Sequence, residues 1–206
     1  MSSRSLSHSS RSSRSSHSSK NFSAKQPARY SSGVIADVSR FDLENKGSRM
    51  TVFICSSPNR TNLSDYIAYM EENDITDIIN FSNTESDAAY SKEDAEHTNV
   101  NFHFLEMSDG SHPSPEIMEV FDEIIDSLIT DNDEPKIMMH CQAGLGRAPV
   151  MLGYLMISRF GYRSKSERLQ VIEVIRDGRR NALNTRQLSW ITTGKIRNRS
   201  TSCVIC

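Results

Sequence analysis

Short apolar runs along this chain alternate with longer stretches in which apolar residues recur at helical spacing. Four runs rich in β-branched and aromatic residues predict strands, over residues 50–55, 76–81, 100–105 and 136–140. Between the first two runs, one face of a short helix behind Asn62 is predicted by Leu63, Ile67 and Met70. A longer stripe predicts a second helix and consists of Ile117, Val120, Phe121, Ile124, Ile125 and Leu128. Strands and helices that alternate in this way predict an α/β fold with a central, mainly parallel sheet flanked by helices.

The last third of the chain predicts helices only. The first runs from residue 147 to about residue 160, because Pro149 is tolerated in a first turn and Gly161 favours termination. The next two begin at predicted capping boxes, in which a polar side chain and a Glu or Gln three residues later cap the backbone. These pairs are Ser164 with Glu167 and Asn184 with Gln187. The middle helix is expected to bury Leu169, Ile172 and Ile175, and the last helix to end at Gly194.

Composition divides the chain into three parts. Residues 1–33 contain fifteen serines and few large apolar side chains, so they cannot bury enough apolar surface to offset the entropy of ordering. We therefore expect a disordered arm over residues 1–48, one domain over residues 49–196 and a basic tail over residues 197–206. The chain has no apolar run long enough for a secretory signal or a membrane span, which indicates a reducing, intracellular setting for its four cysteines. A transit peptide also fits the acid-free arm, but the arm lacks the apolar positions of an amphipathic helix.

Charge follows the same division. Residues 1–36 and residues 178–206 each carry six Lys or Arg and no acid, so all 26 acidic residues lie between them. The remaining 12 basic residues lie there too, which gives residues 37–177 a net charge of −14. This distribution argues against nucleic acid binding by the core and for contact of the two ends with anionic surfaces.

One segment carries the candidate chemistry, with a Cys at the end of a strand, a loop with two glycines and an Arg that opens a helix. Its residues are His140, Cys141, Gln142, Ala143, Gly144, Leu145, Gly146 and Arg147. The glycines permit a ring of inward-pointing amides that, with the helix N-terminus, can bind a phosphate dianion. The planar guanidinium of Arg147 can bind two phosphate oxygens at once. A cation and a helix N-terminus favour the thiolate, so Cys141 is the candidate nucleophile. His140 is expected to fix the loop by a hydrogen bond to the backbone and not to act as a base.

The candidate acid lies upstream of this loop. A leaving oxygen needs a proton, and Asp109 is preferred because it follows a strand end and Gly110 allows its loop to move. An Asp-Gly turn without chemistry is the alternative reading, and Glu106 is the second candidate acid. No metal ligand set and no organic cofactor is implied.

The phosphate loop and the chain end resemble the phosphatases of regenerating liver (type IVA), the prenylated group of the dual-specificity branch of protein tyrosine phosphatases. The resemblance covers residues 50–206 and rests on the segment from His140 to Val150, including Ala148 where most relatives have Ser or Thr. It also rests on Arg179-Arg180, Ala182, Asn184 and Gln187-Leu188, and on Cys203-Val204-Ile205-Cys206 at the position of the prenylation box.

Three features depart from that group. Its acid loop carries Trp-Pro and paired aspartates, where this chain has Leu105-Glu106 and only Asp109. A cysteine that forms a reversible disulfide with the nucleophile in that group aligns with Ser82, so Cys55 is the substitute candidate. The serine-rich arm is an extra segment with no counterpart in that group.

The resemblance implies a phosphatase of phosphoproteins, with phosphotyrosine as the default substrate. Cys141 would attack phosphorus, Arg147 would bind the equatorial oxygens, Asp109 would protonate the leaving oxygen, and Ala148 would slow hydrolysis of the intermediate. Prenylation of Cys203 would place the protein on the cytoplasmic face of plasma or endosomal membranes, partly cytosolic if unprenylated, with the type of prenyl group left open. One alternative is a slow binding module for magnesium transporters with cystathionine-β-synthase-like domains. Another is a phosphoinositide phosphatase, ranked lower because the loop contains no Lys.

Overall fold

The computed structural model describes residues 21–25, 35, 37–45, 47–83, 90–91, 93–95 and 98–196 of the 206. Their strands are β1 (Asn21–Lys25), β2 (Ser39–Asn45), β3 (Ser48–Ser56), β4 (Asp77–Asn80), β5 (Asn101–Phe104) and β6 (Lys136–Cys141). Their helices are α1 (Leu63–Glu72), α2 (Pro115–Asp131), α3 (Arg147–Ser158), α4 (Lys165–Gly178), α5 (Thr185–Thr193) and the 3-10 helix η1 (Glu93–Ala95). The predicted tail and Cys203 lie outside the described residues, as does most of the arm.

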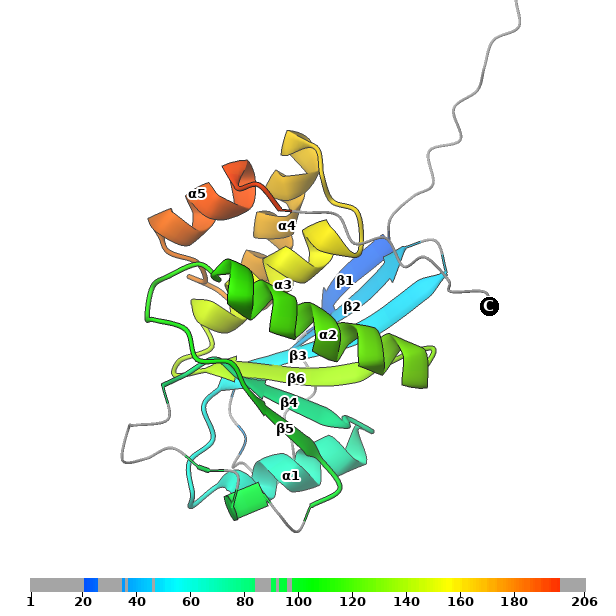
Figure 1. The fold of residues 1–206 in the computed structure, drawn as a ribbon, viewed down its shortest axis with the longest axis vertical. Helices are drawn as coiled ribbons and strands as arrows, with labels where there is room; N and C mark the ends of the chain where they lie inside the picture. The colour runs from blue at the N-terminus through cyan, green and yellow to red at the C-terminus, as the bar shows by residue number, and fades with distance from the viewer. Residues whose placement is uncertain are drawn as a thin grey trace, which may run out of the picture.

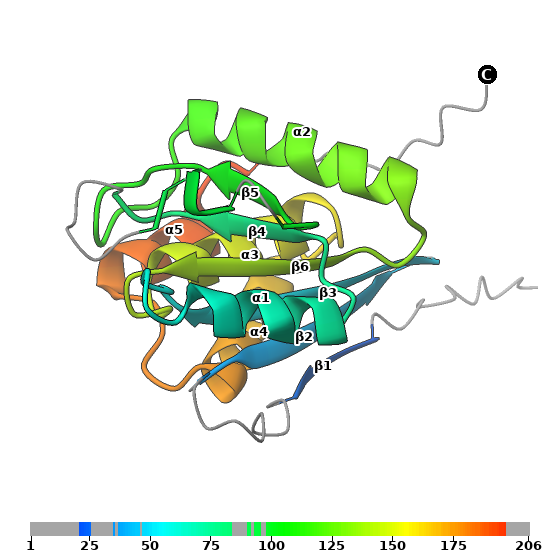
Figure 2. The ribbon, with the colours of Figure 1, turned by 90° about the horizontal axis from the view of Figure 1, so that it is seen from below.

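The strands form one sheet in the order β1-β2-β3-β6-β4-β5. β3, β6, β4 and β5 are parallel, whereas β1 and β2 join the edge as antiparallel strands. Helices α2 to α5 lie on one face and α1 lies on the other (Figure 1), and the view from below shows the same arrangement (Figure 2). The predicted α/β class, with a mainly parallel sheet between helices, is confirmed.

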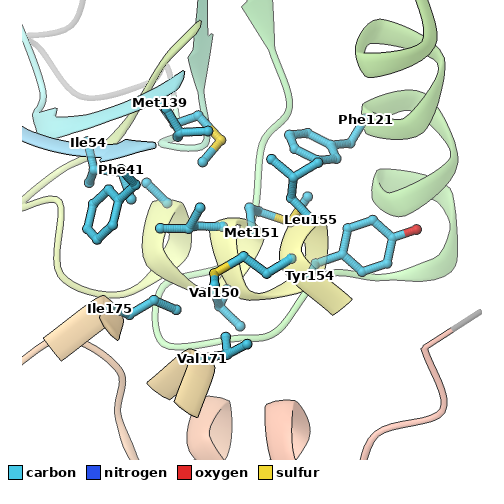
Figure 3. Packing of buried hydrophobic residues seen from close by; sticks show 14 of the residues in the cluster. Phe41, Ile54, Phe121, Met139, Val150, Met151, Tyr154, Leu155, Val171 and Ile175 are labelled. Atoms are coloured by element: carbon cyan, nitrogen blue, oxygen red, sulfur yellow. The ribbon is translucent and has the colours of Figure 1, made fainter. Parts of the chain in front are cut away.

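The main core lies between the sheet and α3. Every residue of α3 is buried, because this helix packs on the sheet and is itself covered by its neighbours. Figure 3 shows Met151 and Leu155 of α3 among side chains from the sheet, from Phe121 of α2 and from Ile175 of α4. Two predicted core positions are wrong: Val120 and Leu169 are each 46% exposed.

A second core fills the face under α1. It contains Phe53 and Cys55 of β3 with Met138 of β6, while Val52 and Ile54 of β3 face the first core. This alternation follows from the two-residue period of a strand. The side chains of Tyr66 and Tyr69, together with Leu63 and Met70, make the buried face of α1.

The domain begins earlier than the sequence predicts. β2 lies within residues 1–48, which were expected to be disordered, yet its Phe41 and Leu43 are buried in the main core. The hydroxyl of Ser39 donates a buried 2.7 Å hydrogen bond to the carbonyl of Gly178 at the end of α4. β1 also lies within that range and pairs with β2. The expected boundary at residue 49 is therefore wrong for these strands, because pairing of β2 with β3 and of β1 with β2 provides the order that their own composition does not.

Both predicted capping boxes are present. Ser164 with Glu167 caps α4, and Asn184 with Gln187 caps α5, which ends at Gly194 as expected. α3 begins at Arg147, as predicted, and ends two residues earlier than expected, at Ser158. Among the described residues, no helix combines the length and the apolar character that crossing a membrane requires.

Candidate active site

The carboxyl ends of the four parallel strands meet at a cavity of about 520 Å³. Its lining comes from the segments that follow these strands, namely residues 57–59 after β3, 82–83 after β4, 106–109 after β5, and Gln142 and Arg147 after β6. In open α/β sheets, ligands bind in the crevice at this edge. The topology therefore brings the phosphate-loop candidates and the acid candidates to one place, although they are about thirty residues apart in the chain.

Cys141 is the last residue of β6, and its side chain is 3% exposed. The strand fixes its backbone, and the loop of residues 142–146 follows before α3 begins at Arg147. Ala148 lies fully buried in the first turn of that helix. The strand, loop and helix that the sequence predicts around the candidate nucleophile are thus present.

Four consecutive carbonyl groups of this loop accept hydrogen bonds from the surrounding protein. The carbonyl of Gln142 accepts from the Ser57 amide at 3.0 Å, and that of Leu145 accepts from the Leu183 amide at 2.8 Å. The two carbonyls between them, of residues 143 and 144, accept from Arg179 at 3.0 and 3.1 Å. Because a peptide unit is planar and trans, each carbonyl held outward directs the following amide the opposite way. The amides of residues 143–146 therefore point toward the loop interior, as anion binding requires.

Arg179 is the residue that holds the middle of this loop. Its side chain is almost fully buried, and its guanidinium also donates to the carbonyl of Asp37 and forms a 3.1 Å ion pair with the Asp37 carboxylate. Asp37 has a φ of +72°, which is uncommon for a residue with a side chain. A charged side chain with several partners is strongly held. The sequence named Arg179 only through a resemblance, and nothing in its local pattern indicated these partners.

Gly144 is required by both its backbone and its surroundings. Its φ is +66°, a region that L residues adopt only at a cost. A Cβ at this position would lie within 2.5 Å of Arg179 Nη2 and closer still to the carbonyl oxygen of Cys55. The loop thus lies directly against β3, and only glycine fits there.

Arg147 is oriented toward the cavity by backbone carbonyls. Its side chain is 6% exposed, and Nη1 donates to the carbonyls of Met107 at 3.1 Å and Phe81 at 3.4 Å. Its Nε lies 3.6 Å from Oδ1 of Asp109 and has no hydrogen-bond partner. The buried guanidinium therefore keeps unused hydrogen-bonding capacity beside the loop.

The structure brings Asp109 to the phosphate loop. Its carboxylate lines the cavity near Arg147, with the side chain 87% exposed. The other candidate acid, Glu106, also lines the cavity and is exposed, and no described contact joins it to Arg147. Of the two candidate acids, Asp109 is thus the one whose carboxylate is placed beside Arg147.

His140 is fully buried behind the nucleophile. Its Nε2 lies 2.6 Å from the hydroxyl of Tyr90, a partner that the sequence did not indicate. Burial lowers the pKa of His140 to about 3, and the charge of Arg147 acts in the same direction. The ring is therefore neutral at physiological pH, which agrees with a supporting role and not with that of a base taking protons at the site.

Cys55 and Cys141 pack on opposite faces of the sheet. Cys55 belongs to the core under α1, whereas Cys141 belongs to the core under α3. Burial raises the pKa of the Cys55 thiol, so Cys55 is held in its unreactive protonated form. This arrangement argues against Cys55 as the substitute for the disulfide partner. Ser82, at the position of the missing cysteine, lines the cavity.

Comparisons with known proteins identify relatives among the phosphatases. Residues 55–160 match the family described as "Polymorphic toxin system, DSP-PTPase phosphatase". The PRL-1 phosphatase of Drosophila melanogaster is 28% identical over 72% of this chain and 78% of its own length. The protein tyrosine phosphatase PRL-1 of Leishmania major is also 28% identical, over 74% of this chain and 86% of its own.

A solved structure shows the same fold. The putative protein tyrosine phosphatase from Leishmania major superposes with a TM-score of 0.55 at 24% identity, over 71% of this chain and 88% of its own. With the phosphate loop at the end of β6 and the matches to named phosphatases, the activity class is that of a phosphatase. The chain belongs to the dual-specificity (DSP-PTPase) family of phosphatases, and within it is similar to the PRL or type IVA protein tyrosine phosphatases.

Proposed function

We propose that this phosphatase hydrolyses phosphate monoesters on proteins, with phosphotyrosine as the default substrate, through a thiophosphate on Cys141. The observation that carries the proposal is the row of four loop carbonyls held outward, which turns the intervening amides toward a bound dianion. Arg147 adds a buried cation with unused donors at the same place. Together these groups can stabilise the charge on the transferring phosphoryl group.

The reaction takes two steps. The thiolate of Cys141 forms a bond to phosphorus as the bond from phosphorus to the tyrosine oxygen breaks, and Asp109 gives its proton to that oxygen. Water then attacks phosphorus, inorganic phosphate leaves, and the electron pair of the S–P bond returns to the sulfur. Arg147 binds two equatorial oxygens in both steps, because its guanidinium is a planar fork.

The charge of the cavity supports a protein substrate over a phosphoinositide with several phosphates. Among the described lining residues, Arg147 is the one cation, while Glu106 and Asp109 are acidic. A second phosphate group would therefore meet like charge at this rim.

Acid-quenched mass spectrometry tests the nucleophile. Wild-type protein mixed with an aryl phosphate should carry one phosphate on Cys141, and Cys141→Ser should carry none. Cys55→Ala is the matched control, since it removes the other described cysteine from the opposite face of the sheet. Phosphate on another residue, or activity that survives Cys141→Ser, contradicts the proposal.

Turnover is proposed to be slow because of Ala148. In related phosphatases a hydroxyl at this position donates to the leaving sulfur, and Ala148 has none to donate. A hydrogen bond to a charged group contributes about 1.5 to 3 kcal/mol, so hydrolysis should be slower by roughly ten- to a hundredfold. Rapid-quench kinetics should show a burst and then slow turnover, which Ala148→Ser accelerates. Without a burst, hydrolysis is not the slow step, and the question returns to the closure of the loop that carries Asp109.

The proposal includes a prenyl anchor on Cys203. This cysteine is fourth from the end and is followed by two aliphatic residues, as in a CaaX signal. One lipid chain binds only marginally, so Lys195, Arg197 and Arg199 are expected to add about 1 kcal/mol each on an anionic leaflet. Cell fractionation should place the wild type with plasma or endosomal membranes and Cys203→Ser in the cytosol. Cys206→Ser, which keeps a CaaX signal, is the control, and equal solubility of wild type and Cys203→Ser contradicts the anchor.

A further inference from the structure

The loop that carries Asp109 is attached to α5 at three successive residues. The carbonyl of Gly110 accepts from Asn184 Nδ2 at 3.0 Å, and the carbonyl of Ser111 accepts from Gln187 Nε2 at 2.9 Å. The imidazole of His112 then stacks on the indole of Trp190, with ring centroids 5.4 Å apart and planes only 6° from parallel.

The same side chains also belong to the framework of α5. Asn184 Oδ1 accepts a hydrogen bond from the backbone N–H of Gln187 at 2.9 Å, and Gln187 Oε1 accepts one from the backbone N–H of Asn184 at 3.1 Å. Each side-chain amide therefore uses its oxygen to cap the helix and its nitrogen to hold the loop. Because the cap orients both groups, their nitrogens are fixed before any substrate binds.

Gln187 also lies against the phosphate loop. A Cβ added at Gly146 would be 3.3 Å from Gln187 Nε2, so this fully buried side chain lies between the two loops. One short helix thus contacts both the loop that would bind the phosphate and the loop that would supply the proton. The separation between the two loops is set by a rigid element and not by a mobile segment.

We propose that Asn184, Gln187 and Trp190 are positioning residues that hold the carboxylate of Asp109 at the phosphate loop, with the His112–Trp190 stack as the latch. The inference rests on the proposed role of Asp109 as general acid. It assigns to α5 the function of keeping the acid loop closed in the free enzyme. Loss of a latch contact should then impair proton donation more than it impairs phosphate binding.

The test compares two substrates that differ in their need for a proton. Phenyl phosphate has a poor leaving group that needs the acid, whereas 2,4-dinitrophenyl phosphate has a good one that does not. The readout is kcat/KM, which covers the steps through formation of the thiophosphate and is unaffected by slow hydrolysis. General acid catalysis contributes about 10²- to 10⁴-fold, so a displaced acid loop should cost roughly tenfold or more with phenyl phosphate.

Two variants disturb the latch with little change to the rest of the fold. Asn184→Asp keeps an oxygen that caps α5 but loses the donor to Gly110, and His112→Ala removes the stacked ring. Both should lose roughly tenfold in kcat/KM with phenyl phosphate and less than about twofold with the dinitrophenyl ester. Trp190→Phe, which keeps a flat ring, should retain most of the activity that Trp190→Leu loses. Ser189→Ala, at an exposed position on the same helix, is the control for changes in α5.

Fluorescence gives a readout that is independent of activity. Trp190 is the one tryptophan of the chain, so its emission reports on the stack directly. In His112→Ala the emission should shift to longer wavelength and become easier to quench with acrylamide. No change in emission in this variant contradicts the latch.

Asp109→Asn separates the inference from the proposed function. If this variant shows no loss that depends on the leaving group, the role of Asp109 is wrong and the inference fails with it. If Asp109→Asn shows that loss but Asn184→Asp and His112→Ala do not, only the latch is wrong. An equal loss on both substrates in the latch variants also overturns it, because general destabilisation does not distinguish the leaving groups.

Discussion

Substitution of Gly144 by alanine tests how closely the phosphate loop lies against the rest of the fold. Gly144 has a φ of +66°, and an added Cβ would meet the backbone of Cys55 and the guanidinium of Arg179. Gly47 offers a matched control, because its φ is +88° and a Cβ there has nothing within 4 Å. The two variants share the backbone cost and differ only in the contacts.

The expected magnitudes follow from this difference. A side chain in the left-handed region costs roughly 1 to 2 kcal/mol, which is the whole effect expected for Gly47→Ala. In Gly144→Ala the phosphate loop must also move by about an ångström, which weakens the hydrogen bonds from Arg179 to the loop carbonyls. A hydrogen bond from a charged group contributes about 1.5 to 3 kcal/mol. We therefore expect Gly144→Ala to lose about 3 to 5 kcal/mol in the free energy of unfolding. A displacement of this size at a reacting centre costs about a hundredfold in rate.

Urea unfolding monitored by circular dichroism measures the first quantity, and kcat/KM with p-nitrophenyl phosphate measures the second. Both variants are assayed at a temperature at which each is fully folded. Gly47→Ala should keep wild-type activity, while Gly144→Ala should lose about a hundredfold and bind orthovanadate weakly. If Gly144→Ala is no less stable and no less active than Gly47→Ala, the argument from close approach is refuted.

Three further predictions concern the supports of the site. Arg147→Lys keeps the charge but loses the planar fork, so kcat/KM should fall by roughly a hundredfold or more while the urea midpoint changes little. The lysine in Arg179→Lys cannot donate to two loop carbonyls and Asp37 at once, so the free energy of unfolding should fall by about 2 kcal/mol and kcat/KM roughly tenfold. Asp37→Asn should have the smaller effect on both. In the folded state the pKa of His140 is about 3, so its ring stays neutral above that pH, whereas in the unfolded state its pKa is 6.5. The unfolded state then binds more protons between these values, so the free energy of unfolding should fall by about 5 kcal/mol as pH drops through this window. His140→Gln should flatten that dependence in acid unfolding curves, and an unchanged curve contradicts the assignment.

Features that depend only on neighbouring residues could be predicted from the sequence. The phosphate loop occupies one continuous segment, from His140 to Arg147, between a strand and a helix. Its chemistry can therefore be read from residue types and spacing. The capping boxes of α4 and α5 have the same property, because each joins residues only three positions apart. Strand and helix periodicity gave the four parallel strands for the same reason.

The distant groups that support the site became visible only in the folded protein. Arg179 is 36 residues from the carbonyl that it holds at position 143, Tyr90 is 50 residues from His140, and Gln187 is 76 residues from Ser111. No local pattern fixes such pairs, since they form only when the strands order and the helices pack. β2 also depends on distant residues. The alternating pattern that buries Phe41 and Leu43 is short, and this segment forms a strand because it pairs with β3. The chemistry of the loop is thus local, whereas its geometry is a property of the whole fold.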